Sequence, residues 1–281
     1  MTAPTGGPFG ARLQAAMAAR GPLCAGIDPH AGLMSAWGLP DSIDGLERFA
    51  LGAAEALGPV VAAVKPQSAF FERFGSRGVA VLERTIEVCR EAGALVVLDV
   101  KRGDIGSTAQ AYADAYLDPS SPIAADAITA SPYLGFGSLA PMLDTARKHD
   151  AGVFVLALTS NPEGPEVQHA ASADGRSVAA HVLDALRGAN AGAGSLGSFG
   201  AVVGATIGEA DGVALDIGGP LLVPGIGAQG GTVDDVRRIF AGVLDAVLPS
   251  SSREILGAGP DPAALRAAAE HAAATFSALV G

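Results

Sequence analysis

The sequence predicts an α/β fold of the (β/α)8 TIM-barrel type, with its 281 residues in a single domain. Short apolar runs alternate with amphipathic stretches along the whole chain, and eight such runs are present. This alternation is typical of parallel βαβ units, and eight units favour a closed barrel over an open sheet. No G-x-G-x-x-G follows the first run, so an open dinucleotide-binding sheet is the weaker interpretation.

The predicted strands are the apolar runs at 22–28, 60–66, 94–100, 126–132, 152–160, 199–206, 221–227 and 245–252. The predicted helices are the stretches 42–57, 76–92, 107–117, 137–149, 175–190, 232–242 and 261–280. Ser42, Asp234 and Asp261 stand at or near expected N-caps. The Gly-rich segment 208–219 in the sixth unit predicts no more than a one-turn helix, and residues 1–8 predict a flexible lead-in to a first helix.

Composition and charge argue against several classes of partner. The net charge is -11, and no cluster of cations is longer than the pair Arg237-Arg238, which argues against nucleic-acid binding. No apolar run approaches the roughly 18 residues that span a bilayer, so no membrane partner is expected. The start of the chain lacks the pattern of a secretory signal, and Cys24 and Cys89 lie in patterns of buried thiols. We therefore expect a cytoplasmic location.

Lysine is rare in this chain and therefore informative. Of the 18 cationic residues only Lys65, Lys101 and Lys148 are lysines. A lysine can transfer a proton, whereas an arginine effectively cannot. Lys148 lies near a predicted helix end and is interpreted as a solvated charge, but Lys65 and Lys101 each follow an apolar run at a predicted strand end.

The stretch LDVKRGDIGST at 98–108 ends the third predicted strand in alternating charges. Asp99 and Lys101 are two residues apart, so their side chains leave the strand on the same side, whereas Arg102 faces the other way and is interpreted as structural. With Lys65 and Asp104 they predict a Lys–Asp–Lys–Asp array at the C-terminal ends of the strands. TIM-barrel active sites lie at that end.

Such an array suits the removal of a carboxylate. Two carboxylates beside Lys101 favour its charged form, which can act as a general acid. They would also repel a substrate carboxylate by about 4 kcal/mol at ~4 Å and an effective dielectric constant near 20, and departure of neutral carbon dioxide would relieve this repulsion. Two alternatives remain open from this motif: an ion-pair network that closes the barrel end, and a magnesium site on Asp99 and Asp104.

A phosphate site is predicted beside this array. VPGIGAQGGT at 223–232 follows an apolar strand and opens a helix, and its glycines allow backbone N–H groups to approach an anion. Gln229 adds a side-chain amide, and Arg253 after the last strand adds a cationic fork. Loops after strands seven and eight commonly bind phosphate in this fold.

Together these motifs resemble the orotidine 5′-phosphate decarboxylase family. DVKRGDIGST resembles the family's D-x-K-x-x-D-I-x-x-T signature, and PGIGAQGG resembles its phosphate loop. The order of AGIDP, VKP, SNPEG and the final arginine also agrees, so the resemblance runs from about Leu23 to Leu256. The stretches IDPH, KPQSAFFE and LTSNPEG resemble the longer bacterial subgroup.

The resemblance implies decarboxylation of orotidine 5′-monophosphate to uridine 5′-monophosphate without a cofactor or metal. Lys101 would protonate C6 of the pyrimidine, Asp99 would crowd the substrate carboxylate, and Lys65 and Asp104 would complete the charge array. It also implies a homodimer in which Asp104 and Thr108 serve the partner's site.

The resemblance further implies residues that bind the nucleotide. Asp28 and Lys65 would bind ribose hydroxyls, Ser160 the pyrimidine ring, and Gln229, Gly230 and Arg253 the phosphate. The segment 162–175 matches the family poorly, and a lid is the one role suggested for it.

Two other functions compete with this one. A magnesium-dependent sugar-phosphate decarboxylase or aldolase of a related barrel also suits D-x-K-x-x-D, but Asp28 is the only extra carboxylate at a strand end. A non-catalytic barrel that binds a phosphate ligand would need Arg253 and the glycines but not Lys101.

Overall fold

The computed structural model describes residues 6–194, 196–207, 213–226 and 230–280. Eight parallel strands form one closed barrel in sequence order, so the predicted fold class is confirmed. Each strand lies within or overlaps its predicted run: β1 (Cys24–Ile27), β2 (Ala63–Pro66), β3 (Leu95–Arg102), β4 (Ala127–Ala130), β5 (Gly152–Leu158), β6 (Phe199–Val203), β7 (Leu221–Pro224) and β8 (Val247–Ser251).

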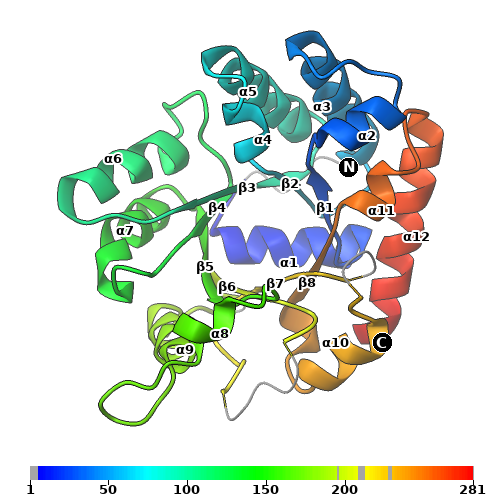
Figure 1. The fold of residues 1–281 in the computed structure, drawn as a ribbon. Coiled ribbons are helices and arrows are strands. Elements are labelled where there is room, and N and C mark those ends of the chain that lie inside the picture. Colours follow the sequence, from blue (N-terminus) through cyan, green and yellow to red (C-terminus); the bar gives the residue numbers. More distant parts are fainter. Residues whose placement is uncertain (1–5, 195, 208–212, 227–229, 281) are drawn as a thin grey trace.

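Helices surround the barrel, as Figure 1 shows. The predicted helical stretches correspond to α3 (Ile43–Leu57), α5 (Ser76–Glu91), α6 (Gly106–Leu117), η1 and α7 (Phe136–Leu139 and Ala140–Lys148), α9 (Val178–Ala189), α10 (Val233–Ile239) and α12 (Pro262–Val280). The expected first helix is α1 (Phe9–Arg20). Short helices that the sequence did not predict are α2 (Ala31–Ala36), α4 (Ala69–Glu72), α8 (Gly164–Gln168), η2 (Leu244–Ala246) and α11 (Arg253–Leu256).

Ser42 caps α3 by accepting a hydrogen bond from Gly45 N, as expected. Asp234 lies in the first turn of α10, near the N-cap as predicted, and the N-cap itself is Thr232. Thr232 forms a capping box with Asp235, which satisfies two backbone donors at once. In the sixth unit, residues 213–219 contain no helix, and residues 208–212 lie outside the described part of the chain. Residues 1–5 of the predicted lead-in also lie outside it.

The helix α1 closes the end of the barrel at which the strands begin, here called the closed end. Figure 1 shows α1 crossing the centre of the barrel. Phe9 and Leu13 are fully buried in one apolar cluster with Leu95 and Phe154. The rings of Phe9 and Phe154 meet edge to face with centroids 5.9 Å apart. A Cβ on Gly152 would lie 2.3 Å from the Phe9 ring, so only glycine leaves space for this ring.

The opposite end of the barrel, where the strands end, is here called the pocket end. Along β3, Val96, Leu98 and Val100 pack outward against the helices, while Leu95 and Val97 face the interior. The same period of two aims the next interior positions, Asp99 and Lys101, toward the pocket end. Among the helices that the structure describes, none is long and apolar enough to cross a membrane.

Candidate active site

A pocket of about 670 Å³ opens at the pocket end of the barrel. This volume suits a ligand of nucleotide size. Its walls come from the ends of all eight strands or the loops that follow them. The lining residues are Asp28, His30, Lys65, Gln67, Phe70, Asp99, Lys101, Thr129, Leu156, Thr159, Ser160, Asn161, Gln168, Val202, Leu222, Pro224, Gly225, Ile226, Ser250, Ser251, Ser252 and Arg253.

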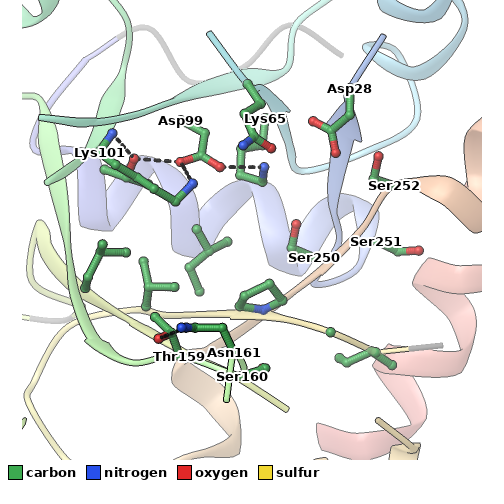
Figure 2. Close-up of a pocket in the computed structure, with 18 of the residues that line it drawn as sticks. Asp28, Lys65, Asp99, Lys101, Thr159, Ser160, Asn161, Ser250, Ser251 and Ser252 are labelled. Carbon is green, nitrogen blue, oxygen red and sulfur yellow. Dashed lines mark hydrogen bonds and ion pairs between the residues drawn. The ribbon is translucent and has the colours of Figure 1, made fainter. Parts of the chain in front are cut away.

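An ion cluster on β2, β3 and β4 forms one wall of this pocket (Figure 2). Asp99 lies between two ammonium groups: Lys65 Nζ is 3.0 Å from its Oδ2 and Lys101 Nζ is 2.5 Å from its Oδ1. The Thr129 hydroxyl donates to the same Oδ1 at 2.8 Å. Each oxygen of the Asp99 carboxylate therefore has a defined partner, and the carboxylate is held in one orientation.

The charge on Asp99 is maintained despite its burial. Burial alone would raise the pKa of Asp99, but the charges and hydrogen bonds of Lys65 and Lys101 hold that pKa well below its usual range. Burial would lower the pKa of Lys65, but the carboxylates of Asp99 and Asp28 outweigh burial and raise it. The pair therefore stays ionised across the physiological pH range.

Lys65 and Lys101 differ in side-chain exposure and in backbone conformation. The Lys65 side chain is 9% exposed, whereas the Lys101 side chain is 45% exposed. Lys101 has a φ of +46°, and its backbone N–H leaves the regular ladder to donate to Thr129 Oγ1 at 2.9 Å. A positive φ is unusual for a residue with a side chain and is found at functional sites that the surrounding fold holds in place. Lys101 is thus the more accessible of the two lysines to a ligand in the pocket.

Arg102 points away from the pocket, as the alternation along β3 predicted. Its guanidinium pairs with Glu72 at 2.5 Å and lies 5.8 Å from the ring centroid of Tyr112. Arg102 therefore ties the end of β3 to α4 and α6.

The remaining predicted residues divide into two groups. Asp28, Ser160 and Arg253 line the same pocket as the ion cluster. Asp104 and Thr108 do not line it: both lie in the segment after β3, where Asp104 accepts a hydrogen bond from the Ile105 backbone and Thr108 is exposed.

The predicted phosphate loop is only partly described. Pro224, Gly225 and Ile226 line the pocket, and the loop closes where Gly231 N donates to Gly225 O at 3.0 Å. Gly230 has a φ of +88°, a conformation that favours glycine, and does not line the pocket. Gln229 lies outside the described residues.

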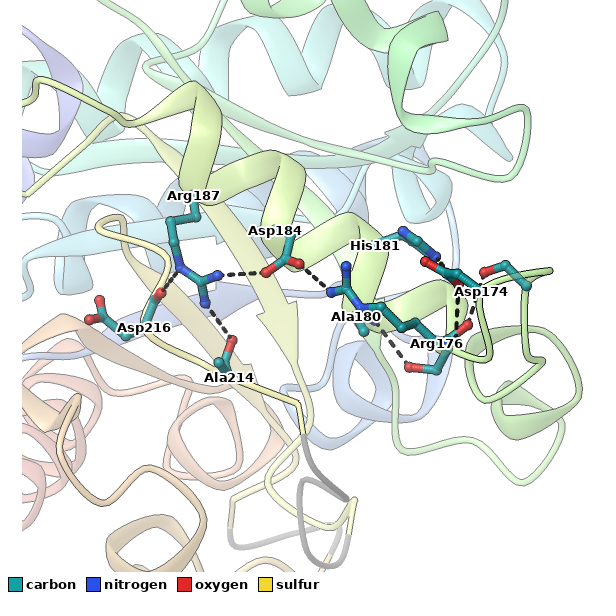
Figure 3. Close-up of polar contacts among 10 residues, drawn as sticks. Asp174, Arg176, Ala180, His181, Asp184, Arg187, Ala214 and Asp216 are labelled. Carbon is teal, nitrogen blue, oxygen red and sulfur yellow. Dashed lines mark hydrogen bonds and ion pairs between the residues drawn. The ribbon is translucent and has the colours of Figure 1, made fainter.

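The segment between β5 and α9 is fixed at both ends. At its start, the Gln168 amide accepts from Thr159 N at 2.8 Å and donates to Thr159 Oγ1 at 2.6 Å. At its end, Asp184 of α9 binds Arg176 and Arg187, and Arg187 donates to Asp216 O at 2.7 Å (Figure 3). The contacts of Gln168 fix the backbone directly before Ser160, and those of Arg176 and Arg187 tie the end of the segment to α9. The predicted lid role of residues 162–175 stays a prediction.

Sequence reasoning missed several lining residues. Thr129, Gln168 and Ser252 were not singled out, and neither were the paired rings of His30 and Phe70, whose centroids are 4.2 Å apart. Thr129 and Ser252 follow the period of two at their strand ends, so that pattern was a usable signal. Gln168 belongs to an unpredicted helix and gave none.

An apolar wall faces the ion cluster. Leu156, Val202 and Leu222 line the pocket from β5, β6 and β7. This wall suits a flat, weakly polar ring. Within the described part of the chain, no group of three His, Cys, Asp or Glu side chains is placed to hold a metal ion.

Residues 21–268 match the model of a protein family described as orotidine 5′-phosphate decarboxylase / HUMPS. The chain belongs to this family. The matched span contains every site residue named above, from Asp28 to Arg253. The resemblance drawn from the motifs is therefore confirmed at the level of the family.

Several bacterial proteins named orotidine 5′-phosphate decarboxylase are similar to this chain. An orotidine 5′-phosphate decarboxylase of Nocardioides sp. is 69% identical over 252 residues, which are 89% of this chain and 92% of the relative. One from Salinispora arenicola is 65% identical, over 93% of this chain and 94% of the relative. A crystal structure from Streptomyces avermitilis, provisionally assigned to the same activity, is 59% identical with a TM-score of 0.96, and covers 100% of this chain and 98% of its own.

Proposed function

We propose that this protein decarboxylates orotidine 5′-monophosphate to uridine 5′-monophosphate and carbon dioxide, a step of pyrimidine nucleotide synthesis. The observation that carries this proposal is the ionised Asp99 between Lys65 and Lys101 at the mouth of the barrel. Membership of the orotidine 5′-phosphate decarboxylase family and relatives of that name support the same activity.

The charge array drives departure of the carboxylate. Asp99 is fixed and negatively charged, so a substrate carboxylate beside it meets repulsion of about 4 kcal/mol at ~4 Å and an effective dielectric constant near 20. The repulsion ends when the carbon–carbon bond at C6 breaks and neutral carbon dioxide leaves. Lys65 keeps Asp99 ionised. Its side chain is only 9% exposed, so Lys65 is not the lysine proposed to transfer a proton to the reacting carbon.

Lys101 supplies the proton. The electron pair of the broken bond stays on C6, where the adjacent ammonium stabilises the developing negative charge. The proton then moves from Lys101 Nζ to C6, and Lys101 regains a proton from water through its exposed side.

The rest of the pocket binds the nucleotide. Asp28 and Lys65 take ribose hydroxyls, Ser160 the pyrimidine ring, and Arg253 the phosphate together with Gln229 and Gly230. Within the described residues Arg253 has no ion pair, so its guanidinium is available to an anion. Binding energy from the remote phosphate then contributes to catalysis at C6.

We include a homodimer in this proposal, with Asp104 and Thr108 completing the partner's site. Both lie outside the pocket of their own subunit. The loops after β3 and β4 expose three large apolar side chains, Ile105, Tyr133 and Leu134, which are 63%, 78% and 53% exposed, and Asp104 directly precedes Ile105. Exposed apolar residues of this size mark a surface that associates with another protein.

A single domain, a reaction without cofactor and a cytoplasmic location belong to the same proposal. Both cysteines, Cys24 and Cys89, are buried free thiols, as is usual in a reducing compartment.

The direct test is to follow the loss of orotate absorbance when the purified protein is given orotidine 5′-monophosphate, with and without EDTA. We expect turnover that the chelator does not change. Absence of turnover would refute the activity, and activity abolished by EDTA would instead favour the magnesium-dependent sugar-phosphate chemistry of a related barrel.

A further inference from the structure

Three buried side-chain polar atoms in the described part of the chain have no hydrogen-bond partner: Asp28 Oδ1, Ser252 Oγ and His149 Nε2. His149 lies before β5, at the closed end of the barrel. The other two both line the pocket. A buried polar atom without a partner costs about 1–3 kcal/mol, so two such atoms in one pocket need an explanation.

Asp28 and Ser252 lie side by side at one edge of the pocket (Figure 2). Asp28 follows β1 and Ser252 follows β8, and these two strands pair directly. A Cβ placed on Gly26 would be 2.5 Å from Ser252 Cβ, 2.9 Å from Ser252 Oγ and 3.2 Å from Asp28 Oδ2. Glycine at position 26 therefore allows the Ser252 side chain to pack close to β1, beside the Asp28 carboxylate. Figure 2 shows Ser252 beside Asp28, on the side of the pocket away from Lys101.

The chemistry of the two groups defines what fits between them. An ionised carboxylate only accepts hydrogen bonds, whereas a serine hydroxyl both donates and accepts. A phosphate oxygen beside Asp28 would be repelled, so the occupant must be a neutral group that donates to the carboxylate and accepts from the serine. A sugar hydroxyl meets both conditions.

The position of these two groups agrees with that assignment. Lys65 of the ion cluster stands next to Asp28 in the pocket (Figure 2), and Arg253, the proposed phosphate ligand, directly follows Ser252 in the chain. In a nucleoside monophosphate the ribose connects the base to the phosphate.

We infer that Ser252 is a substrate-binding residue: its hydroxyl and the Asp28 carboxylate hold a ribose hydroxyl from two sides, and this contact selects ribonucleotides over deoxyribonucleotides. The ribose hydroxyl donates to Asp28 and accepts from Ser252. The inference rests on the proposed function for the identity of the nucleotide.

The test is to measure the affinities of uridine, 2′-deoxyuridine and 3′-deoxyuridine 5′-monophosphates by calorimetry for the wild type and for Ser252→Ala. We expect Ser252→Ala to weaken binding of the ribonucleotide about tenfold, the loss typical of one hydrogen bond. One of the two deoxynucleotides lacks the hydroxyl that Ser252 contacts. Ser252→Ala should leave the affinity for that deoxynucleotide unchanged. The matched control is Ser250→Ala, because the Ser250 hydroxyl already bonds the Cys24 thiol, and this variant should leave the ratio of the affinities unchanged.

Thermal unfolding without ligand gives an independent readout. Removal of an unpaired buried hydroxyl should leave the melting temperature of Ser252→Ala equal to or above that of the wild type. A lower melting temperature would contradict the inference, since it would mean that the hydroxyl is paired within the protein. The inference would also be overturned if Ser252→Ala weakened the binding of all three nucleotides equally, or weakened the binding of none of them. These results are distinct from failure of the proposed function, which would appear as wild-type protein without turnover of orotidine 5′-monophosphate.

Discussion

The closed end and the pocket end of the barrel are built from the same strands with opposite chemistry. On β3, Leu95 and Val97 face the closed end and pack against α1, while Asp99 and Lys101, the next interior positions, face the pocket. Apolar burial at the closed end stabilises the fold. The pocket end contains groups whose burial is unfavourable until each finds an opposite charge or a ligand. The barrel interior thus has one end that stabilises the fold and another end that holds the reactive groups.

The largest effect expected from this division is on catalysis. We expect Lys101→Ala to lower kcat by about 10⁴-fold, since the general acid is lost. Because the Lys101 side chain is half-exposed, the melting temperature and the affinity for uridine 5′-monophosphate should stay close to wild type. Steady-state kinetics, thermal unfolding and calorimetry check the three quantities.

Lys148→Ala is the matched control, because Lys148 is an exposed lysine in the last turn of α7. It should change none of the three quantities. Equal losses of product affinity and of turnover in Lys101→Ala would favour a structural or binding role for Lys101.

At the closed end, we expect Phe9→Ala to lower the free energy of unfolding by about 3–5 kcal/mol, because a fully buried ring is replaced by a cavity. Urea denaturation measures this loss. Below the unfolding transition kcat should remain within about twofold of wild type. A large fall in kcat of the folded variant would break the separation between the two ends.

Asp99 tests the comparison of the closed end with the pocket end further, because it is a reactive group of the pocket end and is also buried. Its pKa in the fold is below its ordinary value, so its contribution to stability is present above about pH 4 and is lost as pH falls through the folded pKa. For Lys65 the folded pKa is raised, so its contribution is present below about pH 10 and is lost as pH rises through the folded pKa.

We therefore expect Asp99→Asn to destabilise the protein by about 3 kcal/mol at neutral pH, the usual result of removing one partner of a buried pair. The difference from wild type should shrink as the pH is lowered below about 4. Chemical denaturation across a pH series measures it. A difference that is constant down to the lowest pH would show that the charge on Asp99 does not stabilise the fold.

The smallest expected effect is the partial recovery of activity when two inactive variants of the shared site form hybrid dimers. Lys101→Ala and Asp104→Ala should each be inactive, but equal mixing should restore roughly a quarter of wild-type activity, because half of the dimers are hybrids with one intact site of two. Subunit exchange is verified with differently tagged chains. If exchange occurs and activity is not restored, Asp104 does not serve the partner's site.

Much of the site followed from strand ends in the sequence. The period of two on β3 separated Asp99 and Lys101 from Arg102, since alternate side chains of a strand leave on opposite sides. The unpredicted α8, with Gln168, shows where this reasoning stops: a five-residue helix has too few residues for a periodic pattern, and its position depends on the contact with Thr159.

The sequence by itself determined the barrel, its eight strands and the charged ends of β2 and β3, because hydrophobic periodicity and residue order are local properties. Only the tertiary structure decided which groups meet. It brought Lys65 and Asp99 to 3.0 Å across neighbouring strands and directed Asp104 out of the pocket. It also left Asp28 and Ser252 unpaired close to Gly26. These relations depend on how β1 and β8 close the barrel, and no local pattern encodes the distance between the first strand and the last.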